Sequence, residues 1–206
     1  MEHEIVIVGA LETNCCLVYC AETLECAIID PGADPDRVFP VIAGLGLRPV
    51  MILNTHGHVD HVGANKDMKD HFGVPILIHS KDNPILQAAM DSELSPLLGA
   101  QPSPAPDRFL KDGETIAIGR STLKVIHLPG HSPGSVGFYG AGTLFSGDTL
   151  FSGGVGRTDL AGGSRRDLEN SIRTKIHVLP PETLVIPGHG PQTTVGQEIE
   201  SNPSLS

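Results

Sequence analysis

The stretch THGHVDH, residues 55–61, decides the fold of this 206-residue chain, because it places four side chains that can bind a metal directly after an apolar run. The run, residues 50–53, is typical of a buried strand. Side chains two apart in an extended segment point the same way, so His56, His58 and Asp60 can converge, whereas His61 turns aside where a helix begins. The sequence therefore predicts a metal-binding loop between a strand and a helix, with room for two adjacent metals.

Length and composition indicate a single globular domain over residues 1–206. The chain is long enough for one well-buried core. Hydrophobic residues make up 39% of it, and its 24 glycines and 17 prolines are typical of a globular protein with many tight loops. With no Trp, two Tyr and six Phe, the core must be largely aliphatic.

Charge and hydropathy exclude several kinds of partner. The formal net charge of −10 argues against binding to nucleic acid or to an anionic membrane, which would repel the protein. The start, MEHEIVIVG, lacks the basic region and the long apolar stretch of a secretory signal, and no run approaches the ~18 apolar residues of a membrane span. We therefore expect a cytoplasmic protein with no nucleic-acid or membrane partner; oligomeric state has no signature in the sequence.

Four cysteines, at positions 15, 16, 20 and 26, fall in one short region without a CxxC pair or a histidine at zinc-finger spacing. We expect them to be reduced, buried thiols in two strands, and not ligands of a structural metal or partners in a disulfide.

Short apolar runs between glycines and prolines predict two sets of strands with helices interposed. The first set comprises residues 5–8, 16–19 and 26–29, an antiparallel meander, followed by 50–54 and 75–78; the second comprises 115–118, 122–127, 135–139, 143–145 and 183–186. Helices are expected over residues 34–43, 60–72 and 83–90. A further helix is expected after a capping box at Ser164, and its buried stripe is Leu168, Ile172, Ile176 and Leu179. A last short helix is expected after a cap at Thr194. The proline-rich residues 95–109 are expected to form a loop, and their part 95–107 is either a lid or a connector. This order suggests two β layers with helices on their outer sides.

Three further candidate ligands each follow an apolar strand: His131 in LPGHSPGS, Asp148 in LFSGDTLF and His189 in VIPGHGP. Each is next to a glycine, as His56 and His58 are next to Gly57, and glycine lets the backbone approach a ligand closely. The other glycines concerned are 130, 147, 188 and 190. Any one of these polar residues could be an ordinary capping or core residue. Seven of them at strand ends predict a metal site, and the other histidines (3, 71, 79, 127 and 177) are expected to be surface or strand residues.

The pattern HxHxDH followed by separate His, Asp and His positions resembles the metallo-β-lactamase superfamily over nearly the whole chain. The resemblance implies an α/β (α+β) fold, a four-layer αββα sandwich with the site at one edge of the β layers. It implies that His56, His58 and His131 hold one metal, that Asp60, His61 and His189 hold the second, and that Asp148 bridges both. Imidazole and carboxylate ligands suit two divalent ions, Zn²⁺ first, with Fe or Mn also compatible.

The aspartate at position 148 favours one branch of that superfamily. Zinc β-lactamases of the main group have a cysteine there, whereas glyoxalase-II-like thioesterases have a bridging aspartate, and nucleic-acid-processing members carry inserted domains or basic exosites. Residues 147–163 and 186–203 resemble a short bacterial branch of hydroxyacylglutathione hydrolases. This resemblance implies that Arg157, with Thr158 and Asp159, binds substrate; the alternative role of Arg157 is a salt bridge with Asp159 that braces the loop.

The chain departs from full-length glyoxalase II at three points. The aromatic residue expected two positions after Arg157 is Asp159, and the tyrosine expected after the last ligand is absent from HGPQ. In addition, we expect a single domain without the C-terminal helical domain of full-length glyoxalase II. Hydrolysis of a thioester does not depend on these features, but recognition of glutathione does.

The reaction implied is hydrolysis of a small-molecule thioester or glutathione conjugate, such as S-D-lactoylglutathione, by a metal-bridging hydroxide, with Asp60 and Asp148 as catalytic ligands. Coordination lowers the pKa of water from about 15.7 to about 7, so hydroxide exists at neutral pH. A first alternative is a persulfide dioxygenase with a single iron, because GRTD resembles that class as well. A second is a metal-binding protein without turnover.

Overall fold

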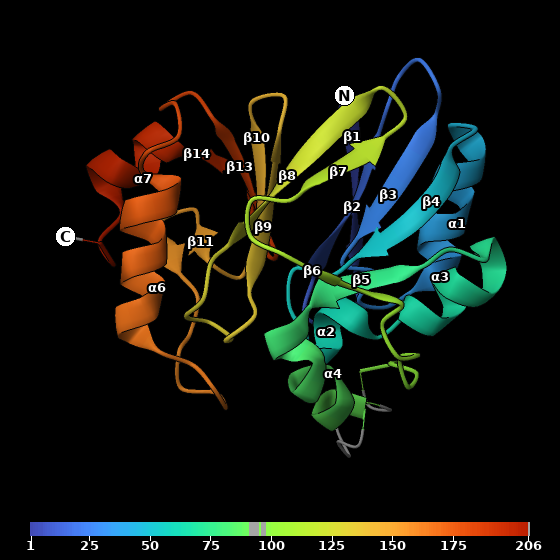
Figure 1. The fold of residues 1–206 in the computed structure, drawn as a ribbon, viewed down its shortest axis with the longest axis horizontal. Helices are drawn as coiled ribbons and strands as arrows, with labels where there is room; N and C mark the ends of the chain where they lie inside the picture. The colour runs from blue at the N-terminus through green and yellow to red at the C-terminus, as the bar shows by residue number, and fades with distance from the viewer. Residues whose placement is uncertain (91–94, 96–97, 206) are drawn as a thin grey trace.

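Two six-stranded sheets form the centre of the computed structural model, which describes residues 1–90, 95 and 98–205 (Figure 1). The first sheet has the order β1 (Glu2–Val8), β2 (Thr13–Tyr19), β3 (Glu25–Ile29), β4 (Arg48–Leu53), β5 (Ile76–His79) and β6 (Arg108–Leu110). Its first three strands pair antiparallel, which confirms the predicted meander, and the later ones pair parallel. Strand β1 begins earlier than predicted because its pairing with β2 extends to Glu2 opposite Tyr19.

The second sheet has the order β14 (Thr193–Thr194), β13 (Leu184–Pro187), β10 (Thr143–Gly147), β9 (Val136–Gly140), β8 (Ser121–His127) and β7 (Thr115–Ile118). Only β10 and β13 pair parallel. A separate hairpin contains β11 (Leu150–Phe151) and β12 (Gly154–Val155). The sequence did not predict β6, β11, β12 or β14, because strands of two or three residues are too short to show an alternating pattern.

The expected loop over residues 95–109 is partly confirmed. Residues 98–107 contain no helix or strand, while 96 and 97 lie outside the described residues. The prediction is wrong at Ser95, which is helical and whose hydroxyl donates to the carbonyl of Ala89. It is also wrong at Arg108 and Phe109, which follow the last proline and pair with β5.

The helices are α1 (Pro35–Gly44), α2 (Val59–Val62), α3 (Asn65–Phe72), α4 (Asn83–Met90), α6 (Arg165–Ser171) and α7 (Val195–Ser201), with a 3₁₀ turn η1 (Ser80–Asp82) and a π turn η2 (Ile172–Ile176) after α6. The predicted helix over residues 60–72 is confirmed except at residues 63 and 64, where it is interrupted between α2 and α3. The N–H of Ala64 donates to the carbonyl of Pro31 at 2.9 Å, outside the helix. The predicted caps are confirmed, since Ser164 accepts from Asp167 N and Thr194 from Gln197 N.

Three layers of apolar contact hold the sandwich together. Between the sheets, side chains of both meet around Phe138 and Phe145, so the core is aliphatic except for these two rings. Helices α1 and α3 cover the outer face of the first sheet, and α6, η2 and α7 cover that of the second (Figure 1). The expected αββα architecture is therefore confirmed.

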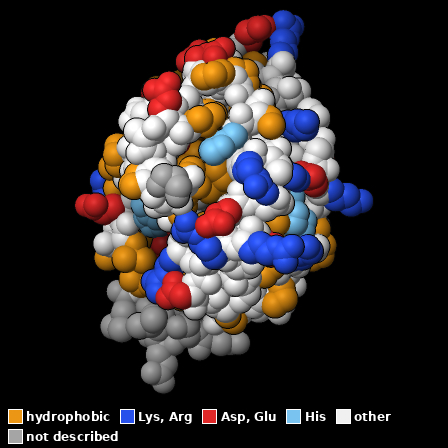
Figure 2. All heavy atoms as spheres, turned by 90° about the vertical axis from the view of Figure 1, so that its left-hand side faces the viewer, with side chains coloured by type: hydrophobic (Ala, Val, Ile, Leu, Met, Phe, Trp, Pro, Cys, Tyr) orange, Lys and Arg blue, Asp and Glu red, His pale blue; other side chains and the backbone are white. Residues whose placement is uncertain are grey.

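The side of the molecule formed by α6 and α7 carries mixed charges. Figure 2 shows Lys and Arg side chains interspersed with Asp and Glu on this side, and within it Arg165 pairs with Glu169 along α6. Among residues 1–90, 95 and 98–205, no helix combines the length and the apolar character needed to cross a membrane.

The inter-sheet core predicts the cost of truncating its central ring. Phe138 is fully buried, so Phe138→Ala should lower the free energy of unfolding by about 3–5 kcal/mol through lost contacts and a cavity. Phe109→Ala is the matched control, because that ring is 44% exposed and its loss should cost about 0.5 kcal/mol. Urea unfolding followed by circular dichroism measures both; equal losses would contradict this account of the core.

Candidate metal centre

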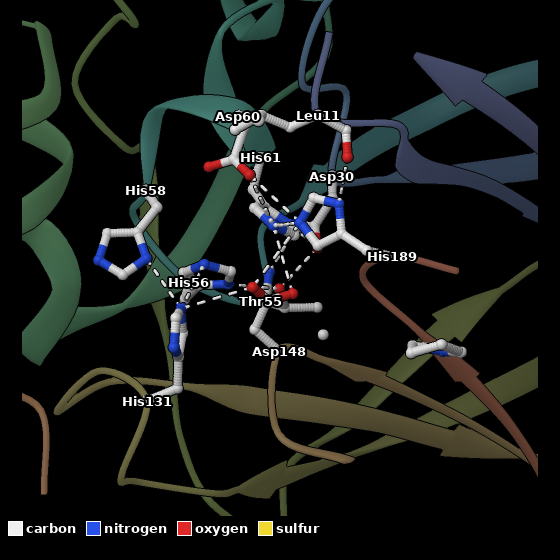
Figure 3. Close-up of polar contacts among 12 residues, drawn as sticks. Leu11, Asp30, Thr55, His56, His58, Asp60, His61, His131, Asp148 and His189 are labelled. Atoms are coloured by element: carbon white, nitrogen blue, oxygen red, sulfur yellow. Dashed lines mark hydrogen bonds and ion pairs between the residues drawn. The ribbon is translucent and has the colours of Figure 1, made fainter. Parts of the chain in front are cut away.

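All seven predicted ligands lie together at one edge of the sandwich (Figure 3). His56 and His58 follow β4, and Asp60 and His61 lie in α2. The others come from the second sheet: His131 from the loop between β8 and β9, Asp148 after β10, and His189 after β13. Loops of both sheets therefore contribute to one site.

The ligand atoms form two groups with one carboxylate between them. Those of His56, His58 and His131 lie within 4.8 Å of one another, and so do those of Asp60, His61 and His189. Asp148 faces both groups, with Oδ1 3.5 Å from His61 Nε2 and Oδ2 3.6 Å from His131 Nε2. This is the arrangement expected of two ligand sets that share a bridging group.

Four of the imidazoles are fixed by a contact at Nδ1. His131 Nδ1 donates to the carbonyl of Arg157 and His189 Nδ1 to that of Leu11, both at 2.8 Å. His61 Nδ1 lies 2.9 Å from an Asp30 oxygen, and His56 Nδ1 3.0 Å from the Thr55 hydroxyl. Because a carbonyl can only accept, Nδ1 of His131 and of His189 must carry the proton, which leaves Nε2 free to bind a metal.

The free nitrogens converge closely. His131 Nε2 lies 3.3 Å from His56 Nε2 and 2.9 Å from His58 Nδ1, and His61 Nε2 lies 3.2 Å from His189 Nε2. Nitrogens with lone pairs aimed at one another repel unless a cation or a proton lies between them. In addition, Asp148 Oδ1 is buried without a hydrogen-bond partner. The residues present therefore fit a pair of divalent cations.

The two groups differ electrostatically. Burial, reinforced by the neighbouring His131, lowers the pKa of His58 to about 4, and burial likewise places the pKa of His56 well below its usual value. Burial alone would also lower the pKa of His61, but Asp148, Asp60 and Asp30 raise it to about 10. His56 and His58 are thus neutral at pH 7, the form that binds metal, whereas the carboxylates around His61 favour positive charge there, carried by a proton or by a cation.

Close packing around the ligands explains a predicted glycine. A Cβ on Gly188 would lie 2.1 Å from Asp148 Oδ1 and 2.7 Å from His61 Cε1. The expectation that glycine permits close approach beside a ligand is confirmed at this position.

The sequence analysis missed two buried carboxylates. Asp30, directly after β3, accepts from the N–H and hydroxyl of Thr55 and contacts His61. It has the same signal as the ligands, an acidic residue directly after an apolar strand and before a proline and a glycine. Asp82 lies in η1 and contacts loops far away in the sequence, so nothing local revealed it.

The predicted substrate-binding segment lies beside the first group, since Arg157 accepts the hydrogen bond from His131 through its carbonyl. The Arg157 guanidinium pairs with both oxygens of Asp159, at 2.8 and 2.7 Å, so the alternative salt bridge does form. Both side chains are exposed and Thr158 is half-buried. No contact shows whether these three residues bind substrate, and that role stays a prediction.

Of the five histidines outside the predicted ligand set, four make ring contacts, and His177 is half-buried at the end of η2. His71 stacks on Phe39, His3 packs edge-on against Phe145, and His79 stacks on His127. All four cysteines are buried, as predicted, but the prediction that they lie in two strands is wrong for Cys20, which follows β2.

Residues 8–189 match the sequence pattern of the metallo-beta-lactamase superfamily. This chain belongs to that superfamily. A protein of Haemophilus influenzae named hydroxyacylglutathione hydrolase GloC is 40% identical over 100% of this chain and 99% of its own length. A probable metallo-hydrolase of Bacillus subtilis, YqgX, is 38% identical over 97% of this chain and 95% of its own.

Solved structures share the whole fold. A crystal structure described as BLEG-1 B3 metallo-beta-lactamase superposes with a TM-score of 0.92 at 38% identity, covering 100% of both chains. TTHA1623 in a di-iron-bound form has a TM-score of 0.89 at 40% identity, covering 97% of this chain and 98% of its own. ETHE1 from Myxococcus xanthus, at 24% identity and a TM-score of 0.82, covers 98% of this chain and 84% of its own and shares the fold.

Removing one ligand from each part of the centre should change metal content. We expect wild-type protein to hold about two ions per chain, His58→Ala to lose the ion of the first group, and Asp148→Ala, which removes the shared carboxylate, to lose most of both. Elemental analysis after desalting measures this. His71→Ala is the matched control, because that ring stacks on Phe39 outside the centre. Full metal content in His58→Ala and Asp148→Ala would refute the ligand assignment.

Proposed function

We propose that this protein is a metal-dependent hydrolase that cleaves a thioester, such as S-D-lactoylglutathione or another glutathione conjugate. The observation that carries the proposal is the convergence of the histidine nitrogens of two groups on either side of Asp148. The name of the Haemophilus influenzae relative, at 40% identity over nearly the full length of both chains, supports the substrate class.

The residues assigned to the two ions follow the two groups. His56, His58 and His131 would hold one, Asp60, His61 and His189 the other, and Asp148 would bridge them. Zn²⁺ suits this mixture of imidazole and carboxylate, and Fe or Mn suits it as well. The di-iron-bound form of TTHA1623 supports testing iron alongside zinc.

Asp60 and Asp148 are the proposed catalytic carboxylates. When bound, divalent ions supply water with a lowered pKa and polarise a substrate carbonyl. The two carboxylates cancel two of the four positive charges of such a pair, so the centre stays attractive to an electron-rich carbonyl. Asp60 is 17% exposed and sits between His61 and His189, where it can accept a hydrogen bond from the attacking water. His131 and His189 are held in one tautomer by their carbonyl partners and so keep their orientation during turnover.

The segment Arg157, Thr158 and Asp159 is the proposed substrate-binding element. The Arg157–Asp159 pair is exposed on both sides, 62% and 68%, and a pair of that kind contributes only about 0–1 kcal/mol. A substrate carboxylate can therefore replace Asp159 as the partner of Arg157 at little cost. The carbonyl of Arg157 meanwhile holds His131, which places the bound substrate next to the first group.

Other activities remain as alternatives to be tested. The persulfide dioxygenase alternative rests on GRTD, residues 156–159, because the likeness to ETHE1 concerns the fold. The description of BLEG-1 as a B3 metallo-beta-lactamase adds β-lactam hydrolysis, since the absence of a cysteine at position 148 argues only against the main group of those enzymes. A metal-binding protein without turnover is the non-enzymatic alternative.

A parallel assay of one preparation separates these functions. Protein loaded with zinc or with iron is given a panel of acyl thioesters that includes S-D-lactoylglutathione, a β-lactam reporter, and glutathione persulfide under oxygen-electrode detection. We expect release of free thiol from at least one thioester and no uptake of oxygen. Oxygen uptake without thiol release would replace the proposal with the dioxygenase, and inactivity towards every substrate would favour the binding protein.

Arg157 should affect binding more than turnover. An exposed ion pair contributes up to about 1 kcal/mol, so Arg157→Ala should raise KM for a glutathione thioester by about two- to fivefold while kcat stays unchanged. For a thioester without a glutathione moiety, KM should not change. Arg173→Ala, an exposed arginine on η2, is the control. A fall in kcat with constant KM would instead point to the bracing role.

A further inference from the structure

Asp82 connects two loops that carry histidine ligands. Its side chain is fully buried at the end of η1. One oxygen accepts from Gly57 N at 2.8 Å and from the Ser132 hydroxyl at 2.6 Å, and the other accepts from Gly134 N at 2.5 Å. Gly57 lies between His56 and His58, and Ser132 follows His131. One carboxylate thus contacts the backbone between two histidines of the first group and the side chain next to the third.

The two loops belong to different sheets. Residues 54–58 follow β4 of the first sheet, and residues 128–135 follow β8 of the second. Val136 N donates to the carbonyl of Thr55 at 2.8 Å and adds one backbone link between them. Among the residues that the structure describes, the other polar links between the loops run through the imidazoles themselves and through Asp82. The relative position of the loops sets the distances from His58 Nδ1 and His56 Nε2 to His131 Nε2.

The glycines of both loops fit the same contact. A Cβ on Gly57 would lie 2.7 Å from the Asp82 carbonyl oxygen, and a Cβ on Gly134 would lie 2.6 Å from Asp82 Oδ1. Real side chains do not approach so closely. The backbone of each loop therefore reaches Asp82 only because these positions are glycine, which accounts for one glycine in HGH and one in HSPGS.

Burial of a carboxylate is energetically unfavourable compared with burial of an apolar side chain. Transfer of its charge from water costs several kcal/mol, and three well-placed donors offset that cost without adding to packing. An apolar side chain of similar volume would pack at lower cost but could not orient three donors. Orientation is the property that the carboxylate adds.

We propose that Asp82 is a positioning residue for the first group: it holds the loops at 57 and at 132–134 in the register at which His56, His58 and His131 meet around one ion. The proposal rests on the metal centre of the proposed function. It assigns to Asp82 no contact with substrate or metal.

Three variants test this role, with metal stoichiometry and hydrogen exchange as readouts. Asp82→Asn keeps the volume but puts an amide donor against a donor, and Asp82→Ala removes every contact of the carboxylate. Ser132→Ala removes one of the three hydrogen bonds to Asp82, together with the contact to the Ser135 hydroxyl, and so serves if the other two fail to fold. We expect the affinity for one of two Zn²⁺ equivalents to fall about tenfold or more in Asp82→Asn, and by less in Ser132→Ala, as measured by competition with a chelator. In the metal-free variants, exchange should accelerate in peptides covering 55–58 and 131–136 and stay unchanged around His189.

Glu198 provides a matched control. It is a buried carboxylate with three donors of its own, Gly153 N, the Thr193 hydroxyl and Asn202 Nδ2, and it braces α7 against the hairpin of β11 and β12. Glu198→Gln should lower the melting temperature yet retain both Zn²⁺ equivalents at wild-type affinity.

Wild-type affinity for both equivalents in the Asp82 and Ser132 variants, with unchanged exchange in both loops, would overturn the proposal. So would equal loss of metal in Glu198→Gln, because the effect would then be general destabilisation. Wild-type protein that binds two ions but cleaves no thioester would refute the proposed function and leave the role of Asp82 intact.

Discussion

The structure depends on one constraint: imidazole nitrogens from both sheets must approach one another to about hydrogen-bond distance with their lone pairs facing inward. In isolation such an arrangement is repulsive. Four of the five rings, those of His56, His61, His131 and His189, are held from behind at Nδ1 by groups that the fold places there, including carbonyls in the β1–β2 connection and in the segment after β12. What lies on the far side of such a ring fixes the nitrogen that is available to a metal.

These supporting groups form a continuous buried polar layer under the centre. Asp30 links the Thr55 backbone to His61, and Asn54 donates to the carbonyl of His61 while exchanging hydrogen bonds with Asn65. The layer lies where the apolar inter-sheet core ends. Buried polar groups are costly unless partnered, so their dense pairing at this edge fixes the loops more firmly than apolar contact could. Repulsion at the centre is thus balanced by satisfied hydrogen bonds one layer below.

The sequence predicted which seven residues would come together, because the segments that carry them follow apolar strands, and strand ends of a sandwich collect at an edge. It predicted element boundaries less well where tertiary contacts override local preference. Ala64, Met68 and Phe72 repeat at helical spacing, yet α3 begins only at Asn65 and is separate from α2. The N–H of Ala64 donates to the carbonyl of Pro31, and the carbonyl of Gly32 lies where a Cβ on Gly63 would be. Asp82 shows the same limit for the site, since its three donors lie 25 to 52 positions away along the chain.

The distribution of charge bears on which substrates the proposed enzyme can use. A chain with a formal charge of −10 repels anions at long range, and a glutathione conjugate is an anion at neutral pH. Attraction must then be local. It would come from a centre in which the positive charge of the bound ions exceeds the negative charge of Asp60 and Asp148, and from Arg157 at the rim of that centre. Arg157 is already paired with Asp159, so an incoming carboxylate gains only the difference between two exposed ion pairs, which is small. Specificity for glutathione would therefore be weak if it depended on this arginine alone. Under the proposed function, the site would recognise the thioester carbonyl more strongly than the glutathione moiety.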